Sequence, residues 1–83
     1  MSGYGDIKTK KFLRALNWLE NNKPVTIQKG GRHNIKVTCI HNGRSFPLPT
    51  SHSEINKHIV KKFVDWLAFN GICTKEEFDQ RLP

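Results

Sequence analysis

The sequence predicts a small α+β domain in which a helix, a three-stranded antiparallel sheet and a second long helix follow one another. Apolar residues recur at three- and four-residue spacing within residues 8–21 and 52–70, which is the period of a helix with one buried face. Between these segments apolar and polar residues alternate, which is typical of strands with one buried face. Because each strand has a single apolar face, both helices should cover the same side of the sheet.

Charge and size together favour a polymeric, negatively charged partner. The 83 residues include 14 Lys or Arg and seven Asp or Glu, for a formal net charge of +7, and the acids are concentrated towards the C-terminus. A field of this sign attracts nucleic acids and releases their counterions on binding. A core this small leaves little room for an enclosed cavity, so any active site should be a shallow surface feature.

Other classes of protein are disfavoured by simple features of the chain. The longest apolar runs have three or four residues, so no membrane-spanning segment is expected. Cys39 and Cys73 belong to no close-spaced pair, which favours free thiols and a cytoplasmic location. The histidines and cysteines also lack the paired spacing of a metal site, so neither a metal nor another cofactor is expected.

The first predicted element is a helix over residues 8–21, after a flexible start over residues 1–7 that has no periodicity. Phe12, Leu16 and Leu19 form its buried stripe. Pro24 ends it, because proline cannot continue a helix. Trp18 falls on the opposite face, where it is either a contact surface or a ring packed over a neighbouring segment.

Three strands are predicted next, near residues 24–29, 33–41 and 44–49. A Gly30-Gly31 turn joins the first pair. Asn42-Gly43, the strongest short hairpin signal, joins the second pair. Prolines in the third strand favour a short strand at the edge of the sheet.

The second long helix is predicted over residues 52–70, opened by the capping box S-x-x-E at residues 51–54. Gly71 is suited to end it in a left-handed conformation. A second capping box, T-K-E-E at residues 74–77, predicts a short last helix. We therefore expect one domain over residues 8–71 and a helical extension over residues 72–83.

This α-β-β-β-α order is the layout of the double-stranded-RNA-binding-domain fold, and several segments resemble a particular family of that fold. "LENN", "VTIQKGGRHNIKV", "FPLP", a nearby histidine and the second helix resemble the HicA (YcfA-like) family over roughly residues 8–70. The most specific part is "KGGRH", which is similar to the family's K-G-S-H element. Arg32 and Asn34 depart from that element, which usually has a small hydroxyl residue before the histidine and often a second histidine after it.

The resemblance implies a toxin of a toxin–antitoxin pair, a metal-independent endoribonuclease that cleaves mRNA and is inhibited by a cognate HicB-like antitoxin. It places His33 at the catalytic histidine. An imidazole suits general acid/base chemistry because its ordinary pKa, about 6.5, is close to cellular pH. Candidate RNA-binding residues surround it in the sequence: Lys29, Gly30, Gly31, Arg32 and Lys36.

Two alternatives stay open on the sequence alone. His52 is a second titratable candidate, in the predicted first turn of the second helix, although its helical position favours packing alongside Ile55 and Ile59. The same fold can also serve as a non-catalytic RNA- or DNA-binding module in which His33 is incidental. Less favoured is an interaction protein whose basic face docks on an acidic partner.

Overall fold

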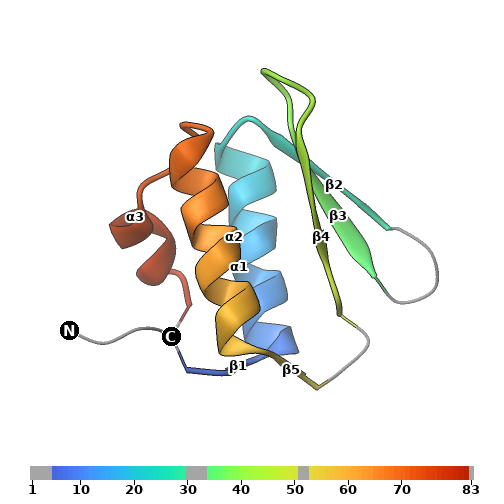
Figure 1. Ribbon diagram of the computed structural model, residues 1–83, viewed down its shortest axis with the longest axis vertical. Helices are drawn as coiled ribbons and strands as arrows, with labels where there is room; N and C mark the ends of the chain where they lie inside the picture. Colours follow the sequence, from blue (N-terminus) through green and yellow to red (C-terminus); the bar gives the residue numbers. More distant parts are fainter. Residues whose placement is uncertain (1–4, 30–33, 51–52, 83) are drawn as a thin grey trace.

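The computed structural model describes residues 5–29, 34–50 and 53–82 and confirms the predicted α+β class (Figure 1). Its elements in chain order are β1 (Ile7–Lys8), α1 (Thr9–Asn22), β2 (Val25–Lys29), β3 (Ile35–Cys39), β4 (Ser45–Leu48), β5 (Glu54–Ile55), α2 (Lys57–Phe69) and α3 (Lys75–Asp79). The three predicted strands are confirmed, each somewhat shorter than expected. No helix in the described ranges is long and apolar enough to cross a membrane.

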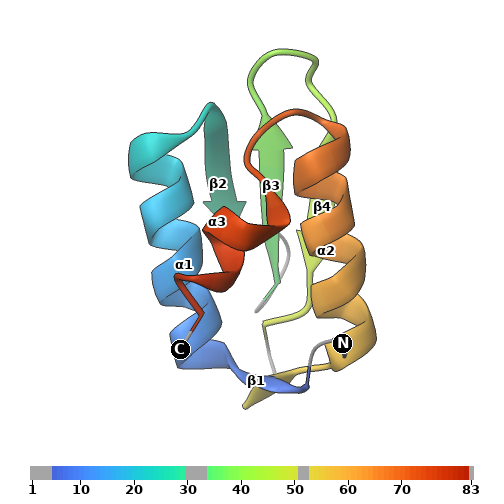
Figure 2. The same ribbon diagram turned by 90° about the vertical axis from the view of Figure 1, so that its left-hand side faces the viewer.

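The main sheet is antiparallel in the order β2-β3-β4. Ile27 lies opposite Val37, and Ile35 lies opposite Leu48. Helices α1 and α2 run side by side in the same direction and cover one face of this sheet, as predicted (Figures 1 and 2). None of the described elements covers the other face.

Helix α3 forms an outer layer over α1 and α2, on the side away from the sheet (Figure 2). Its Phe78 is fully buried and packs against Phe12 of α1 and Phe63 of α2, with ring centroids 5.8 and 5.6 Å away. Phe12 and Phe63 are themselves 5.6 Å apart. The C-terminal segment therefore shares the hydrophobic core of the rest of the chain.

The predicted start of the second helix is wrong. Glu54 and Ile55 form a short strand that pairs with Ile7 and Lys8, and α2 begins only at Lys57. Ile55 is completely buried in this arrangement.

Different groups from those of the predicted capping box satisfy the first amides of α2. The Asn56 side chain accepts a hydrogen bond from the backbone N–H of His58, and asparagine caps a helix as well as serine does. Asp6, more than fifty residues away in the sequence, accepts one from the backbone N–H of Lys57.

Both edge strands of the main sheet carry a feature that disfavours further strand pairing. On β2, the backbone N–H of Ile27 donates to the Glu20 carboxylate at 2.9 Å. On β4, Pro47 has no backbone N–H to offer. One N–H of the edge nearest α1 is thus occupied by a side chain of α1 itself.

Candidate nucleic-acid interface

The predicted catalytic residues fall outside the described part of the chain. Gly30, Gly31, Arg32 and His33 lie outside the described residues, and so does His52. Helix α2 begins at Lys57, five residues after His52, so the prediction that the first turn of this helix contains residue 52 is wrong. What the structure does define is the surface on either side of the 30–33 segment.

Lys29 and Lys36, the two described lysines of the predicted site, lie on opposite faces of the sheet. Lys29 pairs with Ile35, whereas Lys36 pairs with Gln28. Because cross-strand partners share a face, Lys29 lies on the side covered by helices and Lys36 on the open side. The structure therefore does not bring these two cations together at one phosphate.

A second set of exposed polar groups runs along α1. Lys10, Arg14 and Asn17 recur at helical spacing and are all exposed, and we call them the α1 stripe. At 1.5 Å per residue the stripe extends roughly 10 Å. It contains no acidic residue, and neither of its cations forms an ion pair with any described residue. In the sequence, the α1 stripe is visible as polar residues at positions i, i+4 and i+7, which lie on the same side of a helix.

A groove of about 250 Å³ lies between α1 and β2, and we call it the α1–β2 groove. Its lining residues are Leu13, Leu16, Asn17, Glu20, Ile27, Lys29 and Ile35. Leu16 and Ile35 are buried, while Leu13 keeps 40% of its surface exposed. Asn17 and Lys29 are exposed polar groups of this apolar groove, and Asn17 also belongs to the α1 stripe.

On the α3 side of the molecule, by contrast, charges are neutralised within the chain. Lys75 binds Asp65 at 2.8 Å, and Lys61 binds the same carboxylate at 3.2 Å. Both hydrogen bonds lower the pKa of the Asp65 carboxyl, and the one from Lys75 has the larger effect. Lys23 binds Glu77 at 3.0 Å and lowers the pKa of that carboxyl too. Acidic residues of α2 and α3 thus neutralise the nearby lysines.

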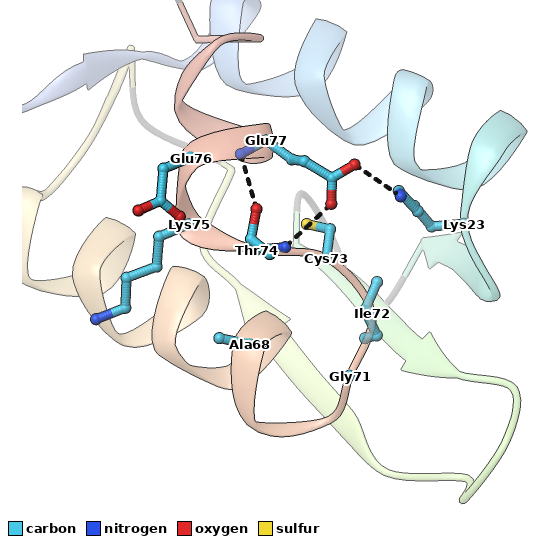
Figure 3. Close-up of a pocket in the computed structure, with 9 residues that line it drawn as sticks. All are labelled: Lys23, Ala68, Gly71, Ile72, Cys73, Thr74, Lys75, Glu76 and Glu77. Carbon is cyan, nitrogen blue, oxygen red and sulfur yellow. Dashed lines mark hydrogen bonds and ion pairs between the residues drawn. The ribbon is translucent and has the colours of Figure 1, made fainter.

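A larger pocket, about 550 Å³, lies where α3 meets α1 and α2 (Figure 3). Its polar groups are largely engaged, because Glu77 binds Lys23 and completes the predicted capping box with Thr74. Burial, together with the Glu77 charge, raises the pKa of the Cys73 thiol to about 11. A thiol that stays protonated at neutral pH is a poor nucleophile, so this pocket offers no reactive group.

Trp18 packs against the α3 side and is not a free contact surface. The Arg81 guanidinium lies 4.6 Å from the centre of its ring, and the Lys23 ammonium lies 5.7 Å away. The ring is half-buried against the core. Of the two alternatives for Trp18, the structure supports packing over a neighbouring segment.

No family model matches this chain, and no curated protein or solved structure matches it either. Membership of the HicA family therefore stays a prediction that rests on the residues of the sequence. The α1 stripe, the α1–β2 groove and Lys29 are the described surface on which a function has to be argued.

Proposed function

We propose that this protein is an endoribonuclease of the HicA toxin type, which binds mRNA through α1 and Lys29 and cleaves it with His33. The observation that carries the proposal is a surplus of unpaired cations. Only three lysines form ion pairs with acids among the described residues, so Lys10, Arg14 and Lys29 are among the many cations that have no such partner. Unpaired cations are available to replace the counterions of an RNA backbone.

The proposed chemistry needs no metal. His33 takes the proton from a 2′-hydroxyl, the 2′-oxygen attacks the adjacent phosphorus, and the bond from phosphorus to the 5′-oxygen breaks. A protonated imidazole returns a proton to the leaving 5′-oxygen. Arg32 and the amides of Gly30 and Gly31 stabilise the negative charge on the phosphate during this exchange.

The site of action and the partner follow from the same proposal. We propose a cytoplasmic location, because the proposed substrate is mRNA and because Cys39 and Cys73 are free thiols. An acidic, HicB-like antitoxin is proposed to inhibit the enzyme by covering His33 and the neighbouring cations. A complex in which the antitoxin leaves His33 open to RNA would count against this mode of inhibition.

The test is a cleavage assay of purified protein on RNA with the His33→Ala variant beside it. Removing a positioned acid/base group should lower the cleavage rate by about 10²–10⁴-fold. His58→Ala is the matched control, because His58 is an exposed histidine on α2, an element that does not contain Lys29 or any residue of the proposed site. Circular dichroism verifies that both variants are folded.

Each outcome of this assay favours one function. Loss of cleavage in His33→Ala alone supports the ribonuclease. RNA binding without cleavage by the wild-type protein indicates the non-catalytic module instead. Equal cleavage by wild type and His33→Ala removes His33 from the mechanism and makes His52 the next histidine to replace.

A further inference from the structure

We propose that the α1–β2 groove is a base-binding subsite, which accepts one unpaired nucleobase of a single-stranded RNA and gives the enzyme a base preference. The inference rests on the proposed function, since it assigns specificity to the same RNA-binding surface. It names Asn17 as the residue that hydrogen-bonds the edge of the base.

The volume and lining of the groove suit a single nucleobase. Its volume of about 250 Å³ lies below the range of roughly 300–1,000 Å³ that is usual for drug-sized ligands. Leu16, Ile27 and Ile35 supply an apolar floor, and the half-exposed Leu13 adds aliphatic surface at the rim. A base has two apolar faces and a polar edge, so it can cover this floor while its edge meets the polar groups.

The polar groups of the groove can form further hydrogen bonds. The side-chain amide of Asn17 is exposed and makes no hydrogen bond to any described residue, so it can both donate and accept. Glu20 uses one carboxylate oxygen to accept from the Ile27 amide, and its other oxygen offers a further acceptor. An acceptor at this position favours bases with an exocyclic amino group over uracil, which presents carbonyl oxygens there.

The same hydrogen bond argues against a peptide as the occupant. An extended peptide would bind by adding a strand to the edge of β2, and it would need the free N–H groups of that edge. The N–H of Ile27, in the middle of β2, is already taken by Glu20. The groove therefore favours a ligand that binds through side-chain contacts.

The position of the groove links it to the rest of the proposed site. Lys29 lines the groove and is the last residue of β2, directly before the 30–33 segment that contains His33. Its cation is available for the phosphate of a nucleotide whose base occupies the groove. Asn17 connects the groove with Lys10 and Arg14 of the α1 stripe, whose cations are available for the neighbouring phosphates.

The experiment measures base preference with and without the Asn17 amide. Binding of short fluorescent oligonucleotides rA, rC and rU is measured by anisotropy on the His33→Ala background, so that no RNA is cut. We expect rA and rC to bind more tightly than rU. Asn17→Ala should weaken binding of rA by roughly tenfold and so reduce its preference over rU, because an asparagine amide can pair with both N6 and N7 of adenine, a contact of the order expected for one good side chain and base pair.

Asn21→Ala is the matched control. Asn21 is the same residue type, one helical turn further along the exposed side of α1, and it lines no part of the groove. Both substitutions place alanine on an exposed helix surface, where it favours the helix, so both proteins should fold. Discrimination should be kept in Asn21→Ala.

The outcomes separate this inference from the proposed function. If Asn17→Ala keeps the base preference of its parent, or if Asn21→Ala loses it equally, the groove is not the subsite. If the parent protein binds all three oligonucleotides alike, the inference also fails. The proposed function fails separately, if the wild-type protein neither binds nor cleaves RNA.

Discussion

The α3 side and the α1–β2 side of the molecule differ in how far their polar groups are satisfied within the chain. The α3 side has the larger pocket, but Lys23, Glu77 and Thr74 there are bound to one another. The α1–β2 groove is less than half that volume, yet Asn17 and Lys29 in it have no side-chain partner among the described residues. Unused bonding capacity, and not volume, is what indicates a binding surface here.

The two sides also differ in what a substitution should affect. Residues of the α3 side should matter for stability, because their contacts are internal. Residues of the α1–β2 side should matter for RNA binding with little effect on folding. The following changes test this division.

The largest expected effect is the loss of stability on replacing Phe78 with alanine. Phe78 is fully buried between Phe12 and Phe63, and truncating such a ring destabilises by about 3–5 kcal/mol. Phe69→Ala is the matched control, because 78% of Phe69 is exposed, and surface changes are usually within about 0.5 kcal/mol. Denaturant unfolding measures the stability of both variants. Equal unfolding midpoints for Phe78→Ala and Phe69→Ala would show that α3 is not part of the core in solution.

Charge reversal should separate the two sides in RNA binding. Lys29→Glu removes an unpaired cation and should weaken RNA binding by roughly tenfold. The slope of log binding constant against log salt concentration should become less steep by about one. Lys75→Glu changes the net charge equally but replaces a lysine already bound to Asp65, so its effect should be clearly smaller. Affinities are measured across a series of salt concentrations. Equal losses would indicate attraction by net charge alone and no localised phosphate site.

A smaller effect is expected where Arg81 stacks on Trp18. Arg81→Ala removes a cation 4.6 Å from the ring centre, a contact worth about 0.5–1 kcal/mol at an exposed site. Arg44→Ala is the control, since Arg44 lies in the exposed β3–β4 turn and has no ring partner among the described residues. Thermal unfolding compares the two, and RNA affinity of Arg81→Ala should stay at the wild-type value.

The smallest effect concerns acid stability. The Lys23 ammonium and the Thr74 amide lower the pKa of Glu77 below its usual 4.5 in the folded state. A lowered folded pKa means that this stabilisation is present above about pH 4.5 and is lost as the pH falls through the folded value. Glu77→Gln should therefore be less stable than wild type at neutral pH, and the difference should shrink in acid.

The neighbouring Glu76 provides the comparison for this measurement. It has no ion-pair partner among the described residues, so Glu76→Gln should leave the stability profile close to that of wild type. A difference between Glu77→Gln and wild type that does not change between pH 7 and pH 3 would show that the Glu77 ion pair does not form in solution.

Features set by neighbouring residues were predictable from the sequence. The alternation of the three strands, the Asn42-Gly43 turn, Gly71 and the Thr74 capping box all appear as expected. Gly43 and Gly71 have φ of 73° and 69°, values that glycine adopts without strain. Each of these features depends on a few adjacent residues, which is why a local pattern suffices.

Features set by distant residues were not predictable in this way. The start of α2 depends on Asp6 and on the pairing of Ile7 with Ile55, and no pattern near residue 51 contains that information. The S-x-x-E motif is a local signal for a helix start, but Glu54 and Ile55 pair with Lys8 and Ile7 as a strand instead. Within α2, Ile59 and Trp66 are only partly buried against the core, whereas Val64 is fully buried.

For the candidate site, the sequence determined the composition and the tertiary structure decided the arrangement. The net charge of +7, the K-G-G-R-H motif and the placing of Lys29 and Lys36 around the turn are properties of the chain itself. Strand register put those two lysines on opposite faces, and the packing of α1 against β2 created the groove beside one of them. The net charge is a sum over the sequence, but two of the three ion pairs, Lys23–Glu77 and Lys75–Asp65, join residues from different segments of the chain, so only the folded chain determines which of these charges are paired.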